Sequence, residues 1–234
     1  MRNMKIVAIG DLVLDMITIV QKFPIEPSKH QLIEKLELEP GGMGNFLIAG
    51  SRLGMDMIAL DIIGDDLFSQ GLKKILEAEK INTTNIIINP NLSAKFVIAL
   101  TDKIGNHVFL SRLSNETYSQ SITPGWIKEI ESSDGIMIVG YSFLEEHFID
   151  ILLQAVKVAK KRGKPVFFDP GPLCNKISED ILFEVISNTE VILLTEEELE
   201  LINKYKKFSN SRKLFDLGIK TICIKLGEQG CRIL

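Results

Sequence analysis

Three glycines stand close together in the segment Pro40-Gly41-Gly42-Met43-Gly44-Asn45, between an alternating pattern and a helical one. Glycine lets the backbone approach a ligand closely, and the first turn of a helix offers N–H groups without partners inside the helix. The segment therefore fits either a ligand-binding loop or a tight turn, and both interpretations stay open. A nucleotide-binding P-loop is excluded, because its Gly-x-x-x-x-Gly-Lys-Ser/Thr spacing is absent.

A dinucleotide-binding fingerprint is an alternative interpretation of the same glycines. Gly42 and Gly44 supply two of its glycines, and Asp61 lies at about the expected distance for the carboxylate that binds a ribose. Against this interpretation, Leu47 occupies the position of the third glycine, and the preceding strand pattern is half-polar where the motif requires a buried parallel strand. An NAD-dependent oxidoreductase stays as an alternative function.

The cysteines and histidines point to no further chemistry. Cys174, Cys223 and Cys231 are odd in number, form no Cys-x-x-Cys pair and stand in or beside apolar stretches. This usage predicts plain buried thiols and no disulfide. The three histidines are scattered without the spacing of metal ligands, so a zinc site is not expected.

The composition limits the class of protein. The chain has 234 residues, of which 45% are hydrophobic and 25% charged, with a formal net charge of −4. These values are typical of a soluble globular protein, and they give no electrostatic footprint for a nucleic-acid backbone. Asp11 and Asp15 interrupt the apolar N-terminal run, so neither a signal core nor a membrane span is predicted. We expect a cytoplasmic protein whose partners are small molecules or proteins, not nucleic acid or a membrane.

Short apolar runs alternate along the chain with segments of helical period. Strands and helices in alternation predict a mostly parallel sheet covered by helices on both faces, with ligands at the carboxyl ends of the strands. The predicted strands are Lys5–Ile9, Met57–Ile63, Gly135–Val139, Pro165–Phe168, Glu190–Leu194 and Thr221–Ile224. The predicted helices are Asn45–Leu53, Leu67–Ala78, Glu145–Arg162, Ser178–Ile186, Glu196–Asn203 and Asn210–Leu217.

Four further strand-like segments do not fit this plan: Leu12–Val20, His30–Glu39, Ala94–Leu100 and His107–Leu113. The second alternates apolar and polar residues, which leaves one face in water and predicts a separate antiparallel layer. The polar, glycine-containing stretch 102–106 is expected to join the last two segments as a hairpin. We therefore predict a single α/β domain over residues 1–234, with a small antiparallel β-lid inserted at about residues 12–39 and 94–113.

Several motifs, in order along the chain, resemble the ribokinase-like (PfkB-type) carbohydrate kinase family. The first part of the resemblance consists of Gly10-Asp11 with Asp15, the Gly-Gly-Met-Gly-Asn segment at 41–45 and Ile63-Gly64-Asp65-Asp66. The second part consists of Phe168-Asp169-Pro170, of Thr195-Glu-Glu-Glu198, which resembles the family's Asn-x-x-Glu, and of Lys225-Leu-Gly-Glu-Gln-Gly230, which resembles its Leu-Gly-x-x-Gly. The resemblance implies a three-layer ribokinase-like α/β core with a mostly parallel central sheet and a small antiparallel β-lid.

The resemblance also implies an activity, the transfer of the terminal phosphate of ATP to a hydroxyl of a sugar or nucleoside. It assigns the substrate hydroxyls to Asp15, Gly41, Gly42 and Asn45. A carboxylate that accepts hydrogen bonds from a diol, beside glycine N–H groups and an amide, is a sensible polar wall for such a ligand. Simpler interpretations stay open, with Asp15 as a solvated residue of an exposed strand and Asn45 as a helix N-cap.

On the nucleotide side the resemblance assigns ATP and Mg²⁺ to Thr195, Glu198, Lys225, Gly227 and Gly230, with Glu198 acting on the metal through water. Thr195 stands where the family has Asn, so its hydroxyl either contacts a phosphate or water or caps the following helix. Lys225 either reaches a phosphate or is exposed at a strand end. The other glutamates of this segment are explained by the preference of a helix N-terminus for negative charge.

Departures from the family pattern limit what the resemblance implies. The glycine segment is one residue shorter than the common form, and Asp169-Pro170 lacks the Asn and Arg that often follow it, so the identity of the sugar stays open. Arg112, on the predicted lid, is either solvated or faces an acidic substrate. Family members continue into a Gly-Ala-Gly-Asp turn whose Asp is the general base, whereas the sequence ends at Leu234. We therefore expect a kinase that lacks its catalytic base in this chain and is inactive in this form.

Two other points stay open. A sugar-binding or scaffold protein with the same fold but no transfer activity is the alternative from a non-enzyme class. The lid strands are expected to present exposed edges, and family members often pair their lids, so a homodimer through the β-lid is a further expectation.

Overall fold

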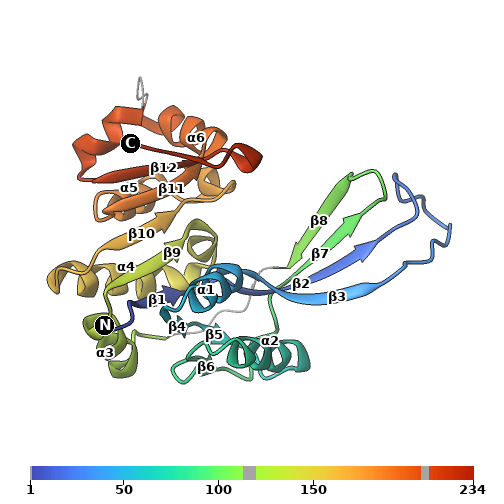
Figure 1. Ribbon diagram of the computed structural model, residues 1–234, viewed down its shortest axis with the longest axis horizontal. Coiled ribbons are helices and arrows are strands. Elements are labelled where there is room, and N and C mark those ends of the chain that lie inside the picture. Colours follow the sequence, from blue (N-terminus) through green and yellow to red (C-terminus); the bar gives the residue numbers. More distant parts are fainter. Residues whose placement is uncertain (1, 113–119, 207–210) are drawn as a thin grey trace.

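The computed structural model describes residues 2–112, 120–206 and 211–234. Within these residues the apolar runs form a seven-stranded sheet with the order β13-β12-β11-β10-β9-β1-β4 (Figure 1). Its strands are β1 (Lys5–Ile9), β4 (Asp56–Leu60), β9 (Gly135–Val139), β10 (Val166–Asp169), β11 (Val191–Thr195), β12 (Thr221–Lys225) and β13 (Cys231–Ile233).

Neighbouring strands of this sheet are parallel, apart from the β12–β13 pair, which is antiparallel. Val7 of β1, for example, lies between Ile58 of β4 and Ile136 of β9. Parallel strands have their carboxyl ends at one edge of the sheet. The residues that follow β1, β9, β10, β11 and β12 are therefore brought to the same edge.

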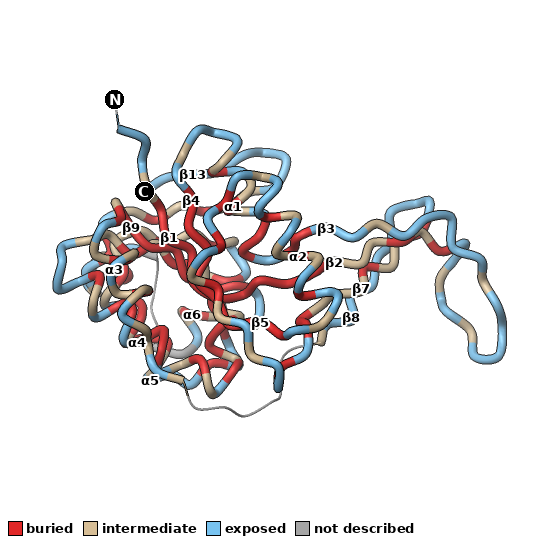
Figure 2. The backbone as a smooth tube through the Cα atoms, turned by 90° about the horizontal axis from the view of Figure 1, so that it is seen from below, coloured by how far each residue is buried: buried red, intermediate tan, exposed pale blue. Residues whose placement is uncertain are grey.

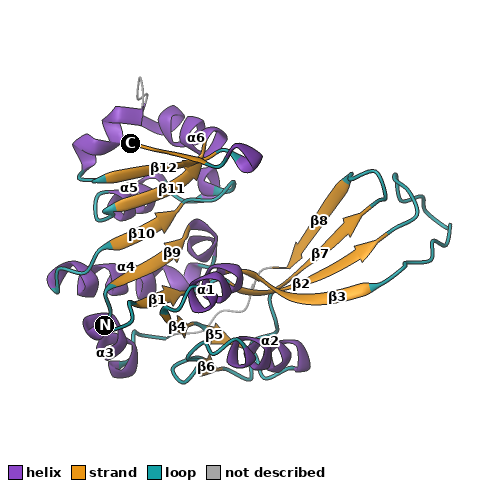
Figure 3. Cartoon of the chain, viewed as in Figure 1, coloured by secondary structure: helices purple, strands orange, loops and turns teal. Residues whose placement is uncertain are grey.

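Helices cover both faces of the sheet (Figure 3). Along β1, Val7 and Ile9 pack into one apolar cluster and Ile6 and Ala8 into the other, as expected of a strand buried on both sides. On the Ile6 face lie α1 (Met43–Arg52) and α2 (Leu67–Ala78). On the Val7 face lie α3 (Pro124–Ser132), α4 (Glu146–Lys161), α5 (Glu179–Ile186) and α6 (Glu196–Lys206). This three-layer arrangement confirms the predicted fold class.

The ends of several elements match the prediction, and others differ. Lys5–Ile9, Gly135–Val139 and Leu67–Ala78 are found with the predicted bounds. The single strand predicted at 57–63 is two, because β4 ends at Leu60 and β5 (Ile62–Ile63) pairs instead with β6 (Ile87–Ile88). The predicted helix at 210–217 is a 3₁₀ segment, η3 (Ser211–Leu217), and Asn210 lies outside the described residues.

The sequence analysis missed α3. The signal was present, because Thr123 is its N-cap, with the hydroxyl accepting a hydrogen bond from the N–H of Trp126 at 3.2 Å, and Pro124 is its first residue. The cysteine prediction was partly wrong. All three cysteines are free, but only Cys174 is buried, and Cys231 is exposed because β13 is an edge strand.

A second, smaller sheet projects from the large one (Figure 1). Its order is β3-β2-β7-β8, with β2 (Leu12–Ile19), β3 (Leu36–Gly42), β7 (Phe96–Thr101) and β8 (His107–Arg112). We call it the small sheet. The β2–β3 and β7–β8 pairs are antiparallel, but β2 and β7 are parallel, so both strands leave the core in the same direction.

The strand predicted at 30–39 was misplaced, because β3 begins at Leu36 and continues to Gly42. The alternation of Leu32, Leu36 and Leu38 does not mark a buried face, since all three side chains are exposed. Figure 2 shows the same contrast, with buried residues along the large sheet and exposed ones along much of the small sheet. The predicted hairpin is confirmed: the carboxylate of Asp102 accepts the N–H groups of Ile104 and Asn106 between β7 and β8.

The glycine segment is not a free loop. Gly41 and Gly42 are the last residues of β3, and α1 begins directly at Met43, with Gly42 as its N-cap at a φ of 51°. Among the described residues no helix is both long and apolar enough to cross a membrane.

Candidate active site

Polar side chains gather at the carboxyl edge of the large sheet. Asp11 follows β1, Tyr141 follows β9, and Asp169, Thr195 and Lys225 end β10, β11 and β12. Since these strands are neighbours in the order β12-β11-β10-β9-β1, the five residues form one row along that edge.

At the β1 end of this row a cavity of about 360 Å³ lies between the large and the small sheet. Its polar wall includes Asp11, Asp15, Ser111, Arg112 and Tyr141. Phe96, Val97 and Phe109 of the small sheet supply apolar wall. A mainly apolar cavity with a few converging polar groups is the usual form of a small-molecule site.

Asp15 and Gly41 are in direct contact at this cavity. They lie on the adjacent strands β2 and β3, and a Cβ atom on Gly41 would lie 2.1 Å from Oδ1 of Asp15. Only glycine therefore fits at position 41 while Asp15 keeps this rotamer. Burial, and after it the negative charge of Glu39, raises the pKa of the half-buried Asp15 carboxyl.

Asp11 and Gly42 make a similar contact. A Cβ atom on Gly42 would lie 2.5 Å from Oδ2 of Asp11, and the backbone carbonyl of Asp11 accepts the N–H of Met43 at the start of α1. Burial raises the pKa of the Asp11 carboxyl to about 7. Lys95 opposes the rise, and three nearby carboxylates, those of Asp61, Glu145 and Asp15, add to it.

The structure separates Asn45 from this group. Its side chain is exposed on α1 and is not part of the cavity wall. It is also not the helix N-cap, since that position is held by Gly42. The glycine segment thus brings Asp11, Asp15 and the backbone at Gly41 and Gly42 together, and leaves Asn45 outside.

At the other end of the row, Lys225 joins two carboxylates. Its Nζ lies 2.7 Å from Oδ2 of Asp169 and 3.5 Å from Oε2 of Glu198. A cavity of about 310 Å³ opens beside it, lined by Thr195, Gly227 and other residues of the same two segments. Gly227 and Gly230 have positive φ values, 58° and 84°, and no atom within 4 Å of a built Cβ, so the backbone here is open to a close neighbour.

Thr195 and Glu198 form a reciprocal cap at the start of α6. The N–H of Thr195 donates to Oε2 of Glu198 at 2.8 Å, and the N–H of Glu198 donates to the Thr195 hydroxyl at 3.2 Å. The carboxyl of Glu198 is buried, and burial is the main cause that raises its pKa. Of the two alternatives for Thr195, capping is the one that the structure shows.

Tyr141 connects the two ends of the row and was not singled out from the sequence. It lines the larger cavity, and burial together with the charges of Asp11, Glu198 and Asp169 raises the pKa of its phenol. Its signal in the sequence is its position directly after the apolar run Gly135–Val139, where parallel strands place ligand-binding groups.

Comparison with known proteins decides the family. A model described as pfkB family carbohydrate kinase matches residues 3–234. The chain belongs to this family.

Relatives of this pfkB-family chain are similar over nearly its whole length. A deoxyribokinase from Salmonella typhi is 24% identical over 233 residues, which cover 97% of this chain and 74% of the relative. The crystal structure of the nucleoside kinase of Methanocaldococcus jannaschii, an archaeal member of the ribokinase family, has a TM-score of 0.78 at 21% identity and covers 98% of this chain and 73% of its own. An Arabidopsis thaliana ribokinase complexed with ribose and ATP has a TM-score of 0.80 at 18% identity, with 100% and 75% covered.

The pfkB-family fold gives the glycines a different setting from that of a dinucleotide site. Gly42 ends β3 of the small sheet and Gly44 lies in the first turn of α1, so neither follows a buried parallel strand. Asp61 is 1% exposed and accepts the N–H groups of Leu12 and Ile62, so its carboxylate faces no open ribose site. The structure therefore does not support the oxidoreductase alternative.

The side chains of this pfkB-family chain that could hold a metal ion are suited to binding it through water rather than directly. The described residues contain no group of three or more His, Cys, Asp or Glu side chains placed to hold a metal ion. Glu198 has one oxygen engaged by the N–H of Thr195 and close to Lys225. The described residues thus suit a Mg²⁺ ion held through water better than one coordinated by a cluster of protein ligands.

Proposed function

We propose that this chain carries the two binding sites of a kinase that transfers the terminal phosphoryl group of ATP to a hydroxyl of a sugar or a nucleoside. The acceptor binds at Asp15, in the cavity between the large and the small sheet. The observation that supports the proposal is the single row of polar groups along the carboxyl edge of the large sheet. A cavity whose wall includes Asp11 and Asp15 lies at one end of the row, and a lysine between two carboxylates lies at the other. An acceptor and a donor bound at the two ends would meet near Tyr141.

At the acceptor end, the carboxylate of Asp15 accepts hydrogen bonds from substrate hydroxyls. Gly41 and Gly42 carry no side chain, so the carboxylates of Asp15 and Asp11 keep their places against the backbone. Phe96, Phe109 and Tyr141 offer aromatic surface to the apolar face of a sugar or to a base. The small sheet acts as a lid over this cavity and excludes water from it.

At the donor end, ATP supplies the phosphoryl group when it is bound. Lys225 would balance negative charge there, Gly227 and Gly230 would allow the chain to pass close to the nucleotide, and Glu198 would hold water bound to a Mg²⁺ ion. In the transfer, the substrate hydroxyl oxygen bonds to phosphorus as the bond from that phosphorus to its bridging oxygen breaks. The hydroxyl proton must pass to a general base. The family resemblance assigns this base to the Asp of a Gly-Ala-Gly-Asp turn, a motif that residues 1–234 do not contain.

Calorimetry tests the acceptor site directly. The wild-type chain is titrated with ribose, deoxyribose, fructose and a panel of nucleosides, and the compound that binds is then titrated into the Asp15→Asn variant. We expect a loss of affinity of about tenfold or more in this variant, because a charged acceptor of two hydroxyl bonds is replaced. Glu37→Gln, which removes a partly exposed carboxylate from β3, serves as the matched control. Equal affinities of Asp15→Asn and wild type would remove Asp15 from the site.

A sugar-binding or scaffold protein without transfer activity is the alternative, and the donor site separates the two functions. Only the kinase needs the groups around Lys225. Calorimetric titration with ATP and Mg²⁺ is expected to show nucleotide binding. ADP release, followed in the presence of the compound found above, measures transfer separately. A chain that binds the sugar but has no measurable affinity for ATP would favour the alternative.

We also propose a homodimer through the small sheet. Leu38, Met16, Ile98 and Leu110 lie side by side across its four strands, on the face that alternates with Asp15 and Val97. Leu38 and Leu110 are 45% and 52% exposed, so the two outer residues of the row are open to a partner, while Met16 and Ile98 between them are partly buried. Sedimentation of wild type and Leu110→Glu tests it: a dimer that becomes a monomer in the variant supports the interface, and a wild-type monomer at high concentration contradicts it.

A further inference from the structure

A group of buried charges lies where the small sheet joins the core. Lys95 directly precedes β7 and Asp11 directly precedes β2, so both stand at the base of the two strands that leave the core together. The Nζ of Lys95 donates to Oε1 of Glu145 at 3.0 Å and lies 3.4 Å from Oδ2 of Asp61. Lys95, Asp61, Glu145 and Asp11 are all less than 10% exposed, at 7%, 1%, 5% and 6%.

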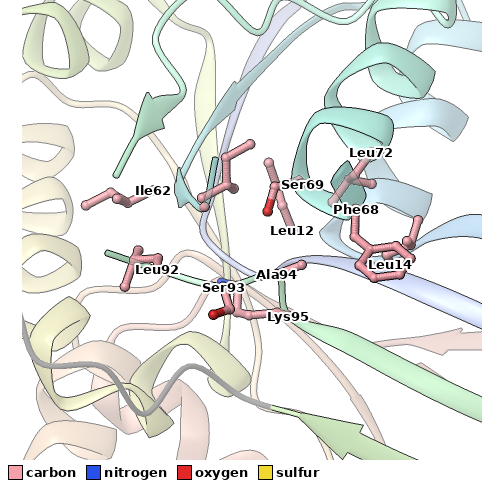
Figure 4. Close-up of a pocket in the computed structure, with 12 residues that line it drawn as sticks. Leu12, Leu14, Ile62, Phe68, Ser69, Leu72, Leu92, Ser93, Ala94 and Lys95 are labelled. Carbon is pink, nitrogen blue, oxygen red and sulfur yellow. The ribbon is translucent and has the colours of Figure 1, made fainter. Parts of the chain in front are cut away.

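The apolar surroundings of Lys95 leave water little access to its charge. Figure 4 shows Lys95 with Leu92, Ser93 and Ala94 on one side of a small pocket and Phe68, Ser69 and Leu72 of α2 on the other. The space inside is about 10 Å³, which is at most the room for one water molecule. The ammonium group therefore depends on Asp61 and Glu145, whose negative charges hold its pKa above the usual range despite burial.

The same carboxylates tie the small sheet to the large one. Asp61, at the end of β4, accepts the N–H of Leu12, the first residue of β2, at 2.8 Å, and that of Ile62 at 2.7 Å. Glu145, at the start of α4, reaches Lys95 with one oxygen and lies 3.3 Å from Nε2 of His147 with the other. The backbone carbonyl of Lys95 also accepts the N–H of Leu14 at 3.1 Å. The cluster thus fixes the bases of β2 and β7 to each other and to the core.

Asp11 connects this cluster to the cavity. It is part of the cavity wall, where it stands near Asp15 and Tyr141, and it feels the charges of Lys95, Asp61 and Glu145 behind it. Arg112 faces the same cavity from β8. Lys95 is the one cation among the groups that shift the Asp11 carboxyl, and its charge opposes the burial and the three carboxylates that raise the pKa of Asp11 to about 7.

We propose that Lys95 is a positioning residue of the acceptor site. Lys95 joins Asp61 and Glu145 at the base of the small sheet, and so holds the Asp11 carboxylate at the cavity wall. There the carboxylate accepts a hydrogen bond from a substrate hydroxyl. The inference rests on the proposed function, because it deepens the acceptor end of that site. The ionised form of Asp11 is the better acceptor, since hydrogen bonds to a charged group are the stronger ones.

The sign of the pH effect follows from these charges. Substrate affinity in the wild type should rise with pH through about 7, as Asp11 loses its proton. Lys95→Met removes the charge that lowers the pKa of Asp11, so the midpoint moves to higher pH and the affinity at pH 7 falls by about tenfold. Glu145→Gln removes a charge that raises this pKa, so its midpoint moves to lower pH. If the cluster had a purely structural role, Lys95→Met and Glu145→Gln would not move the pH midpoint in opposite directions.

The experiment measures the dissociation constant of the compound found in the panel by calorimetry between pH 5.5 and 9, for wild type, Lys95→Met, Glu145→Gln and Asp11→Asn. Asp11→Asn is expected to lose the pH step. Lys128→Met, which removes an exposed lysine of α3, is the control and should match wild type. Circular dichroism reports whether each variant folds. If Lys95→Met does not fold, it is replaced by the double variant Lys95→Met with Glu145→Gln, which removes one charge of each sign. If the affinity and the pH midpoint of the double variant equal those of Glu145→Gln alone, the proposal is contradicted.

A second measurement keeps this inference separate from the proposed function. The titration of the Asp11 carboxyl carbon, followed by ¹³C NMR in the absence of ligand, should show the same opposite shifts in Lys95→Met and Glu145→Gln. If Lys95→Met and Glu145→Gln fold, bind the panel compound with wild-type affinity and leave the Asp11 titration unmoved, the proposed role of Lys95 is wrong. The proposed function is not affected by that outcome. Failure of every panel compound to bind, with the NMR shifts present, contradicts the proposed function and leaves the electrostatic coupling of the cluster established.

Discussion

The N–H of Thr195 donates to the Glu198 carboxylate at 2.8 Å, and the N–H of Glu198 donates back to the Thr195 hydroxyl at 3.2 Å. One buried glutamate thus serves both the start of α6 and the region beside Lys225. These two roles of Glu198 can be separated, because glutamine at this position of a helix also completes the cap, whereas only glutamate carries a charge.

Glu198→Gln should keep the stability of the wild type to within about 0.5 kcal/mol, and Glu198→Ala should lose about 1 kcal/mol with the cap. Both variants should bind ATP with Mg²⁺ more weakly, because they lack the charge that the proposed function assigns to the water around the metal. Urea denaturation and calorimetry measure the two effects. Glu200→Gln, on the exposed side of α6, is the control. If Glu198→Gln binds ATP with Mg²⁺ as the wild type does, Glu198 acts only as a cap.

Lys225→Met should weaken ATP binding by about tenfold, as expected from the loss of one charge-assisted contact to a phosphate. Its effect on the free energy of unfolding should stay below about 1 kcal/mol, because the Lys225 side chain is 38% exposed and solvent screens the Asp169 pair. Calorimetry and urea denaturation check both values. Lys220→Met, from the residue just before β12, should leave the affinity unchanged. Equal affinities of Lys225→Met and wild type would place Lys225 outside the nucleotide site.

Gly41→Ala should abolish binding of the sugar or nucleoside, because the new Cβ atom would displace the carboxylate of Asp15, 2.1 Å away. The matched control is Gly71→Ala in α2, where a Cβ meets nothing within 4 Å. This second variant should keep its affinity and gain about 0.5–1 kcal/mol of stability, since alanine favours a helix. A Gly41→Ala chain that folds and binds normally would show that Asp15 has another productive rotamer.

Asp66→Ala should lower the free energy of unfolding by about 1–2 kcal/mol at neutral pH, because Asp66 is the N-cap of α2. Burial works against ionisation of this carboxyl. The Ser69 hydroxyl and the N–H groups of Ser69, Phe68 and Ala94 outweigh burial and hold its pKa below the usual value. Because the pKa of Asp66 is lower in the folded than in the unfolded protein, its carboxylate stabilises the fold at pH values above the unfolded pKa of about 3.8. This stabilisation is lost as the pH falls through the lower pKa of the folded state.

The measurement for Asp66 is urea denaturation of wild type and Asp66→Ala at pH 7 and at successively lower pH. The difference between the two proteins should be full at pH 7 and shrink below pH 4. A difference that is the same at every pH would mean that the charge of Asp66 does not contribute.

The central sheet could be predicted from the sequence because its strands are buried on both faces. Continuous apolar runs such as Lys5–Ile9 and Gly135–Val139 are the direct signature of that burial. The small sheet was harder. Leu32, Leu36 and Leu38 are apolar but exposed, so their alternation gave β3 the wrong start. Helix α1 begins inside the glycine segment, where no capping side chain marks it.

The site could be predicted in part. Its residues that lie close together in the sequence could be found, and those brought together from distant positions could not. Asp15, the glycines and the Thr195–Glu198 pair lie in short segments whose spacing carries their pattern. The cluster around Lys95 has no such pattern, because its partners lie 34 and 50 positions away along the chain. Only the folded chain brings the residue before β7 next to the residue after β4 and the residue before α4, and the composition gives no sign that these charges are buried.

The small sheet leaves the core through two hydrogen-bonded parallel strands, β2 and β7, and returns through β3 and β8. Pairing along β2 from Leu14 to Ile19 prevents the strands from sliding past one another. Any displacement of this sheet is then a bend of four strands at once, with a single axis near Asp11, Gly42 and Lys95. Mechanically it is a stiff flap, not a loop that rearranges residue by residue. Access to the cavity beneath should follow one coordinate, which a pair of fluorescent labels on the flap and the core can record as a distance.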